Sequence, residues 1–254
     1  MVVAGNYMEE DCGNDPHYLF PFQEIDEIEQ ITVKRPNCLR CKRPERVCVC
    51  FAFPKVPVPI TTTLHILQHP REQDFRQLTT VPLLQECIPK DKCVIYRGKR
   101  FPKSKFAKLH EVCAQTNTAV LYPAKDAVDI KDFVAQLDGE PLQLIVLDGT
   151  WQEARAIGHN CSALLKGIPK VKITGSWRSE FVIKTQPTDE SVSTLEAVAI
   201  ALSQIEQIPD FITIARKPLK ALCDFQIQHG AQIHESKESL ARKGIKYRIF
   251  EKKF

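Results

Sequence analysis

A carboxylate and an indole sit at one corner in the stretch LDGTWQEAR. The apolar run LQLIV comes directly before Leu147, so Asp148 falls at the carboxyl end of a buried strand. Open α/β sheets bind their ligands at that edge. A carboxylate there is costly to bury unless it is paired or used, and Gly149 after it allows a sharp turn or a close approach to a ligand. This corner is the first candidate site.

The next two residues each have a structural and a functional interpretation. Thr150 precedes Glu153 by three residues, which is the spacing of a capping box at the start of a helix. Trp151 could pack into the core, or its indole could stack on a base. Taken alone, each residue fits its structural role.

Four of the ten cysteines crowd into the segment CLRCKRPERVCVC. They are Cys38, Cys41, Cys48 and Cys50. This spacing lets four thiolates close a tetrahedral site, for which zinc is the usual ion. An iron–sulfur cluster on the same thiolates and a group of buried free cysteines are the alternatives. Because the protein would fill all four positions around a zinc ion, we expect a structural role for it.

Positive charge surrounds these cysteines and continues along the chain. The basic residues between them are Arg40, Lys42, Arg43 and Arg46. The chain as a whole carries +4, but residues 1–30 carry −8, which leaves +12 on the remainder. Residues 237–254 contribute +5 of that excess. This distribution fits a polyanionic partner such as RNA, and ordinary surface charge is the alternative.

Polar residues recur where other predicted strands end or helices begin. His69 follows one strand and Tyr122 ends another. Ser193 and Glu196 have the spacing of a second capping box, with Thr194 between them. Each residue is a weak signal, but their recurrence at strand ends and helix starts indicates one shared edge.

Strand and helix patterns alternate from residue 60 onward, which predicts an α/β fold with a mostly parallel sheet and helices on both faces. Strands are expected at 61–68, 92–98, 118–123, 142–148 and 171–174, and helices at 69–79, 103–115, 127–137, 150–165, 193–208 and 219–230. The predicted divisions are a partly disordered acidic leader (1–33), a four-cysteine zinc knuckle with a proline-rich connector (34–59), an α/β catalytic domain (60–230) and a basic tail (231–254).

Targeting signals are not evident in the sequence. No apolar run has the length of a membrane span, and the first thirty residues contain no Lys or Arg, which a signal or transit peptide would need. The expected location is the cytoplasm or the nucleus. Nothing in the sequence indicates a membrane or an obligate protein partner.

Five segments together resemble the DTW-domain family, the tRNA-uridine aminocarboxypropyltransferases. They are CLRCKRPERVCVC, LQHPREQDFRQLTT, LYPA, LDGTWQEAR and STLEAVAIAL, in the family's order. The resemblance covers about residues 34–225, and the cysteine spacing combined with D-x-T-W and S-T-x-E-A is specific. It implies S-adenosylmethionine as donor, tRNA as acceptor and a sheet related to the knotted SPOUT class.

The implied reaction transfers the 3-amino-3-carboxypropyl group to N3 of a uridine and releases methylthioadenosine. Uridine N3 must lose a proton to attack, so Asp148 is the candidate general base or the group that orients N3–H. Trp151 could stack on the uracil or the adenine, and Thr150 completes the expected catalytic group. The expected donor or substrate contacts are His69, Tyr122, Leu147, Gly149, Ser193, Thr194 and Glu196.

RNA contacts are expected from arginines in the knuckle and near the site. They are Arg40, Arg43, Arg71, Arg76 and Arg178. Two other functions stay open at this point. One is a SPOUT-type RNA methyltransferase, which would use the same donor and release S-adenosylhomocysteine. The other is a zinc-knuckle RNA-binding protein without catalysis.

Overall fold

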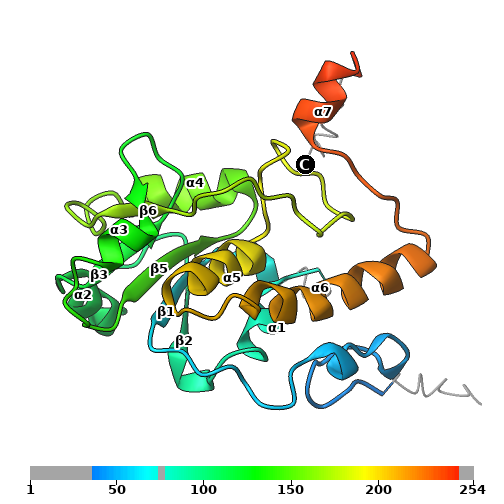
Figure 1. Cartoon of the computed structure of the whole chain (residues 1–254), viewed down its shortest axis with the longest axis horizontal. Helices are drawn as coiled ribbons and strands as arrows, with labels where there is room; N and C mark the ends of the chain where they lie inside the picture. Colours follow the sequence, from blue (N-terminus) through cyan, green and yellow to red (C-terminus); the bar gives the residue numbers. More distant parts are fainter. Residues whose placement is uncertain (1–35, 74–77, 246–254) are drawn as a thin grey trace, which may run out of the picture. The chain divides into compact units, whose positions relative to one another are not determined.

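A six-stranded, all-parallel sheet organises the chain (Figure 1). The structure is a computed structural model that describes residues 36–73 and 78–245. The strands are β1 (Thr63–Gln68), β2 (Cys93–Arg97), β3 (Thr118–Leu121), β4 (Val128–Asp129), β5 (Gln143–Asp148) and β6 (Lys170–Lys172). They lie in the order β2-β1-β5-β3-β6-β4. The predicted α/β class with a parallel sheet is confirmed.

Strands β1 and β5 are neighbours inside the sheet, and their carboxyl ends hold the candidate site. Both are largely buried, as expected for strands that are covered on two faces. Their register places Gln68 opposite Asp148, the last residue of each strand. Because all strands are parallel, the residues that follow β1, β3 and β5 lie along one edge of the sheet.

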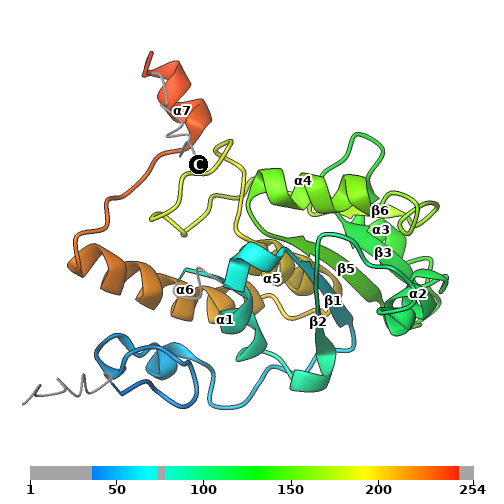
Figure 2. The same ribbon diagram turned by 180° about the vertical axis from the view of Figure 1, so that it is seen from behind.

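Helices cover both faces of this sheet (Figures 1 and 2). They are α1 (Val81–Gln85), α2 (Ala107–Cys113), α3 (Ile130–Val134), α4 (Trp151–Asn160), α5 (Thr194–Ile205), α6 (Phe211–Gln228) and α7 (Lys237–Arg242), with short 3-10 helices η1 (Glu45–Val47), η2 (Cys50–Ala52), η3 (Pro70–Gln73) and η4 (Lys90–Lys92). Alternate residues of β5 serve two cores. Leu144 and Val146 pack with α1, α3, α5 and α6, whereas Ile145 packs with residues of α2 and α4. The alternation places consecutive side chains of β5 on opposite faces of the sheet.

The cysteine segment packs directly onto the main core. Val49 and Phe53 are buried in the same core as α5 and α6. The ring of Phe51 meets the ring of Phe225 in α6 edge-on, with 6.4 Å between their centroids. Disorder of the cysteine segment would therefore expose apolar surface of α6 to solvent.

The predicted helix over residues 69–79 is wrong in the residues that the structure describes there. Only η3 forms after His69, and a new helix, α1, begins at Val81. Pro70 fits a first helical turn, which favoured a helix from this point. Pro82 fits the first turn of α1 equally well, so the proline signal did not decide between the two starts.

The last predicted helix, 219–230, begins eight residues earlier, at Phe211. Pro218 lies inside α6, where proline removes a backbone hydrogen bond, so the sequence pattern favoured a start just after it. Phe211 and Ala215 are fully buried on the same face as Leu219. Burial of this apolar face explains why the helix continues through the proline.

Some expectations fall outside the described residues, among them the acidic leader 1–33, its disorder and Arg76. From Pro36 onward the chain forms one compact unit. In the described part of this unit, no helix is both long and apolar enough to cross a membrane. The SPOUT-like knot stays a prediction.

Candidate functional site

The Asp148 carboxylate is buried at the end of β5 and held by polar neighbours. Asp148 is only 4% exposed. Gln68 Nε2, from the end of β1, donates to Asp148 Oδ2 at 2.9 Å. Arg97 Nε, from the end of β2, donates in turn to Gln68 Oε1 at 3.0 Å. Three adjacent strands thus fix the position of one carboxylate.

Burial raises the pKa of Asp148 above the ordinary range of an aspartate. Hydrogen bonds from Gln68 and Thr194 and the positive charge of Lys184 oppose that rise. Thr194 is the first residue of α5, so the carboxylate faces the start of this helix. A buried carboxyl with a raised pKa at the ligand-binding edge of a sheet is a candidate for a group that exchanges a proton.

The glycine after Asp148 lets two side chains approach each other. Gly149 has φ +155°, and a Cβ on it would lie 3.0 Å from Glu153 Cβ and 3.3 Å from His69 Cβ. His69 Nδ1 lies 3.2 Å from Glu153 Oε1 and 3.4 Å from the Arg71 amide nitrogen. Of these two contacts, the one from the Arg71 amide has hydrogen-bond geometry, with Nδ1 as the acceptor. The Glu153 carboxylate is therefore a close neighbour of the His69 ring.

Replacing Gly149 with alanine is expected to destabilise the protein by about 1–3 kcal/mol. The new methyl group would crowd Glu153 and His69 in a backbone conformation that alanine disfavours. Gly158→Ala is the matched control, because its Cβ would lie 3.5 Å from Leu147 Cδ1, an ordinary contact, inside helix α4. Chemical denaturation should show Gly158→Ala at or above wild-type stability. Equal losses in the two variants would contradict the crowding at Gly149.

Thr150 forms the capping box that its spacing predicts. Its hydroxyl accepts from the Glu153 amide at 3.3 Å, and Glu153 Oε2 accepts from the Thr150 amide at 2.9 Å. Trp151, the first residue of α4, is 36% exposed, so it is not a core residue. Its indole is open to a stacking partner, as the functional interpretation requires.

Glu196 is fully buried at the start of α5 and holds the preceding loop in place. Its carboxylate accepts from the Ser179 hydroxyl at 2.6 Å and the Glu180 amide at 2.7 Å. It also lies 3.1 Å from Arg216 Nη2 and closes a capping box with Ser193. Glu196 thus joins the loop before α5, the start of α5 and Arg216 of α6.

We expect Glu196→Ala to lower the free energy of unfolding by about 3 kcal/mol or more, because it leaves the Arg216 guanidinium without its buried partner. Glu180→Ala removes the other carboxylate that pairs with Arg216, but that side chain is 47% exposed. This control should cost less than about 1 kcal/mol. Urea titration of the two variants checks the difference. Similar losses would contradict the central position of Glu196.

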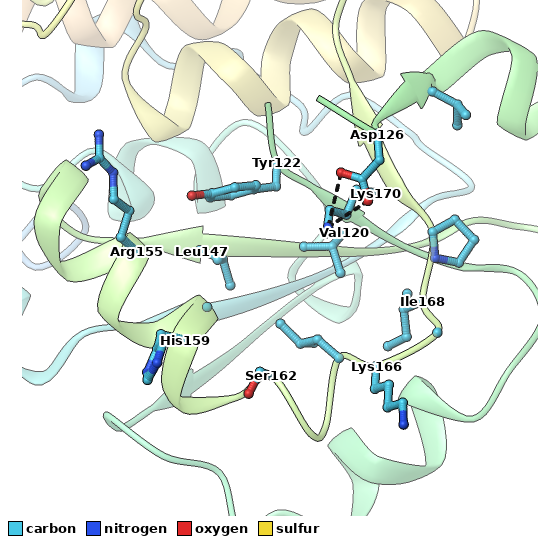
Figure 3. A pocket seen from close by; sticks show the side chains of 15 residues that line it. Val120, Tyr122, Asp126, Leu147, Arg155, His159, Ser162, Lys166, Ile168 and Lys170 are labelled. Carbon is cyan, nitrogen blue, oxygen red and sulfur yellow. Dashed lines mark hydrogen bonds and ion pairs between the residues drawn. The ribbon is translucent and has the colours of Figure 1, made fainter. Parts of the chain in front are cut away.

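A cavity of about 560 Å³ lies on the α4 side of the sheet (Figure 3). Its wall includes Tyr122, after β3, and Leu147 of β5, two of the predicted ligand contacts. Arg155 and His159 of α4 line it as well. Since Leu147 and Asp148 are consecutive, their side chains point to opposite faces of the sheet. The cavity and the Asp148 carboxylate thus flank one strand end from two sides.

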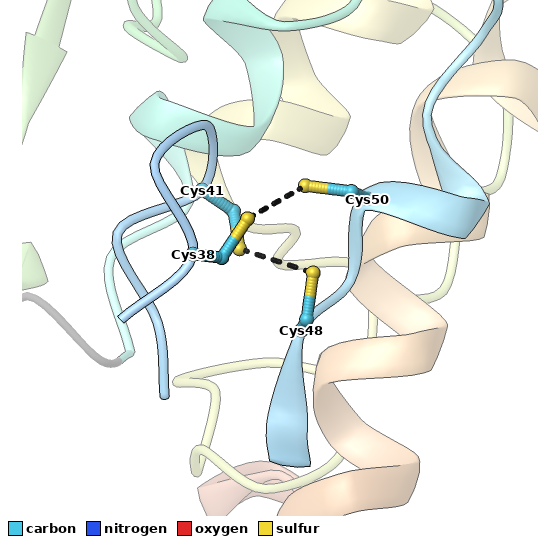
Figure 4. A group of neighbouring side chains, drawn as sticks. All are labelled: Cys38, Cys41, Cys48 and Cys50. Atoms are coloured by element: carbon cyan, nitrogen blue, oxygen red, sulfur yellow. Dashed lines mark hydrogen bonds between the residues drawn. The ribbon is translucent and has the colours of Figure 1, made fainter. Parts of the chain in front are cut away.

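The four predicted metal ligands come together (Figure 4). All their Sγ atoms lie within 4.8 Å of one another, with 3.5 Å between Cys38 and Cys50 and 3.7 Å between Cys41 and Cys48. Four thiolates around one tetrahedral zinc would lie about 3.8 Å apart. A cluster of several irons holds its thiolates farther apart, because iron and sulfide atoms lie between them. The group therefore fits a single ion and could hold zinc.

The backbone around Cys38 also suits a metal ligand. Amides of Cys41 and Arg40 donate to its sulfur and lower the pKa of this thiol to about 6. Because metals bind the thiolate, this environment favours the ligating form. Lys42, with φ +57°, completes the tight turn, and its amide donates to the Cys38 carbonyl at 2.9 Å.

The predicted RNA-contacting arginines lie in different environments. Arg40 is exposed, forms an ion pair with Glu86 and lies over the Phe53 ring at 4.9 Å. Arg43 is 7% exposed, so its guanidinium is largely withdrawn from the surface. Arg71 and Arg178 are exposed. Of these four, Arg43 is thus the least accessible to a phosphate.

Sequence reasoning missed Gln68 and Arg97, which hold Asp148. A usable signal existed, because Gln68 is a polar residue at the end of an apolar strand, as Asp148 is. Their pairing depends on the neighbouring position of β1 and β5, which the sequence order of the strands does not give. Arg155 and His159 of α4, which line the cavity, were also missed, because the cavity depends on which strands are neighbours.

Comparisons with known proteins show the family of this chain. The DTW domain profile matches residues 35–228. The chain is 43% identical over 213 residues to the tRNA-uridine aminocarboxypropyltransferase 2 of Mus musculus and 41% identical over 212 residues to that of Macaca fascicularis, covering 84% of this chain and 70% of each relative. It is 38% identical over 210 residues to the Drosophila melanogaster protein of that name, covering 82% of both. No solved structure matches the chain. By its matched profile and these relatives, the chain belongs to the DTW-domain family.

Proposed function

We propose that this protein is a tRNA-uridine aminocarboxypropyltransferase that uses S-adenosylmethionine as its donor. The name shared by relatives at 38–43% identity supports the reaction class. The observation that carries the proposal is the buried carboxylate of the DTW corner, which Gln68 and Thr194 hold at the edge of a parallel sheet. Substrates of α/β enzymes bind at that edge.

The proposed reaction forms a bond between uridine N3 and the terminal carbon of the 3-amino-3-carboxypropyl group. The N3 proton goes to a base, and the bond between that carbon and the sulfonium sulfur breaks. Its electron pair returns to the sulfur, so methylthioadenosine leaves as a neutral thioether. The enzyme therefore has to remove one proton and to align one carbon of three on the sulfur.

In the proposed site, residues 148–151 and the start of α5 remove the proton and align the substrates. Asp148 accepts the N3 proton or orients N3–H, and its raised pKa brings it closer to the working pH. Trp151 offers its exposed indole to the uracil or the adenine. Thr150 and Gly149 shape the turn on which both depend. Thr194 and Ser193 present the start of α5 to the same carboxylate.

We place the adenosine part of the donor in the cavity beside α4. Its volume of about 560 Å³ falls in the range of small-molecule sites. Tyr122 supplies an aromatic face, and Leu147 connects this wall to the Asp148 corner. Zinc at the four cysteines would have a structural role, since the protein fills every position around it.

The small-molecule product tests the proposal. Purified protein, unmodified tRNA and S-adenosylmethionine should yield methylthioadenosine, in an amount equal to the modified uridine. S-adenosylhomocysteine would instead show methyl transfer. Neither product, from protein that holds its metal and binds tRNA, would favour a non-catalytic RNA-binding protein.

A further inference from the structure

The C-terminal residues 231–245, here called the strap, fold back over the loop 178–191 that leads into α5 (Figure 1). Three strap amides donate to loop carbonyls: His234 to Val182 at 2.8 Å, Lys237 to Gln186 at 2.9 Å and Glu238 to Pro187 at 3.2 Å. The matched family domain ends at residue 228. The strap is therefore an addition to that domain that is docked on one of its loops.

Asp189 of the loop fastens the strap. Its carboxylate accepts hydrogen bonds from the Ser236 hydroxyl and from Arg242 of α7. Its amide donates to Glu238 Oε2 at 3.0 Å. One loop residue therefore contacts three strap residues, which makes Asp189 the point where a single substitution would loosen the strap most.

Loop and strap together enclose a polar pocket of about 280 Å³. The loop contributes Arg178 and Lys184, and the strap contributes His234 and Arg242. Hydroxyl groups of both segments line the remaining wall. Within the described part of the chain, neither Arg178 nor Lys184 forms a salt bridge, whereas Arg242 is held by Asp189. The Ser179, Ser236 and Ser239 hydroxyls already donate to carboxylates, and Thr188 and Ser191 share one hydrogen bond. The pocket thus offers an anion two cations and one hydroxyl donor of the Thr188–Ser191 pair.

The loop that lines the pocket continues toward the Asp148 corner. The positive charge of Lys184 acts on the Asp148 carboxylate. The loop also runs directly into Ser193 and Thr194, at the start of the helix that lowers the pKa of the same carboxyl group through Thr194. An anion held by this loop would therefore bind to the segment that leads into the start of α5.

We propose that this pocket binds a phosphodiester group of the tRNA strand that flanks the target uridine, and that the strap completes the pocket. The inference rests on the proposed function. Arginine, lysine and hydroxyl side chains are the usual partners of RNA phosphates. Such contacts would position the strand so that the uridine reaches Asp148, without reading its sequence.

Asp189→Asn and Glu235→Gln in the full-length protein separate the strap's role from simple electrostatics. Both variants remove one negative charge from the pocket wall. Glu235 pairs with Ser239 and Lys243, both inside the strap, so its loss leaves the contacts with the loop intact. Asp189→Asn removes the ionic attachment of the strap to the loop. We expect Asp189→Asn to bind tRNA about tenfold more weakly, and Glu235→Gln to bind as well as wild type or slightly better.

Two further readouts complete this test. Hydrogen exchange at the His234 and Lys237 amides should accelerate in Asp189→Asn, which reports release of the strap. For tRNA binding by Arg178→Gln, the negative slope of log K against log salt should become less steep by about 0.9. This is the value for one lost phosphate contact in duplex nucleic acid, about 0.9 per contact. Both results would support a phosphate site that the strap completes.

Other outcomes would overturn the proposal. Tighter tRNA binding by both carboxylate variants would show that the strap contributes only charge. Weaker binding of S-adenosylmethionine by Arg178→Gln without tRNA, at an unchanged salt slope, would assign the pocket to the donor carboxylate. If wild type modifies tRNA while Asp189→Asn binds normally, only this inference fails. If wild type neither binds nor modifies tRNA, the proposed function fails and the pocket loses its ligand.

Discussion

Asp148→Asn should reduce the rate of transfer to tRNA by about 10²–10⁴-fold, the usual contribution of a general base. The amide has the shape of the carboxylate and can still accept from Gln68, so the corner should keep its geometry. The asparagine amide, however, is not basic enough to accept the N3 proton. Single-turnover transfer assays at saturating donor and tRNA measure this effect apart from binding.

The same variant should be at least as stable as wild type. Burial raises the folded-state pKa of Asp148 above its unfolded value of about 3.9, so the folded protein binds this proton more tightly. Ionisation therefore costs stability as the pH rises from that value through the folded pKa. Asparagine avoids this cost, so its advantage in free energy of unfolding should grow across that interval and then stay constant. In wild type, transfer should increase with pH over the same range, as the base loses its proton.

Asp129→Asn is the matched control for this prediction. Asp129 also ends a parallel strand and caps a helix, by accepting from the Lys131 amide at 2.8 Å. Asparagine is an equally good cap, so both transfer and stability should stay at the wild-type level. A large loss of transfer in Asp129→Asn, or wild-type transfer in Asp148→Asn, would contradict the role of the DTW carboxylate.

Loss of one zinc ligand should have the largest effect on stability. Cys48→Ser is expected to release the metal and to lower the melting temperature by roughly 10 °C or more, because structural zinc binding contributes directly to folding. The cysteine segment carries Val49 and Phe53 into the core beside α6, so its disorder would expose that apolar surface. Differential scanning calorimetry and elemental analysis of the same samples provide the two readouts.

Cys113→Ser makes the same chemical change outside the cluster and serves as the control. Cys113 is partly buried at the end of α2, far from the four cysteines in sequence. This variant should keep one zinc per chain and lose only about 1 kcal/mol. Iron in place of zinc in the purified protein would contradict the single-zinc assignment. Retention of full zinc content by Cys48→Ser would exclude Cys48 as a ligand.

The sequence predicted the features that depend on local pattern. The apolar run before Asp148 and the spacing of Thr150 and Glu153 identified β5, the start of α4 and its capping box, and all three are present. The cysteine spacing also predicted correctly that the four sulfur atoms lie close together. Residues near one another in a tight turn have few possible arrangements, so this prediction needed only local pattern.

Features that depend on strand order could not be predicted in this way. Gln68 and Asp148 are eighty positions apart and meet only because β5 lies next to β1. The continuation of α6 through Pro218 depends on burial against α5 and α1, which outweighs the local cost of the proline. The docking of the strap on Asp189 likewise joins two segments that share no local pattern.

The origin of the transferred carbon distinguishes aminocarboxypropyl transfer from methyl transfer. tRNA should be incubated with S-adenosylmethionine labelled with ¹³C in the aminocarboxypropyl chain and, separately, in the methyl group, followed by mass spectrometry of the nucleosides. We expect label on uridine from the first donor only, together with a block to reverse transcription at that uridine, because N3 is substituted. Label from the methyl donor, or a modified uridine whose N3 still pairs, would contradict aminocarboxypropyl transfer to N3.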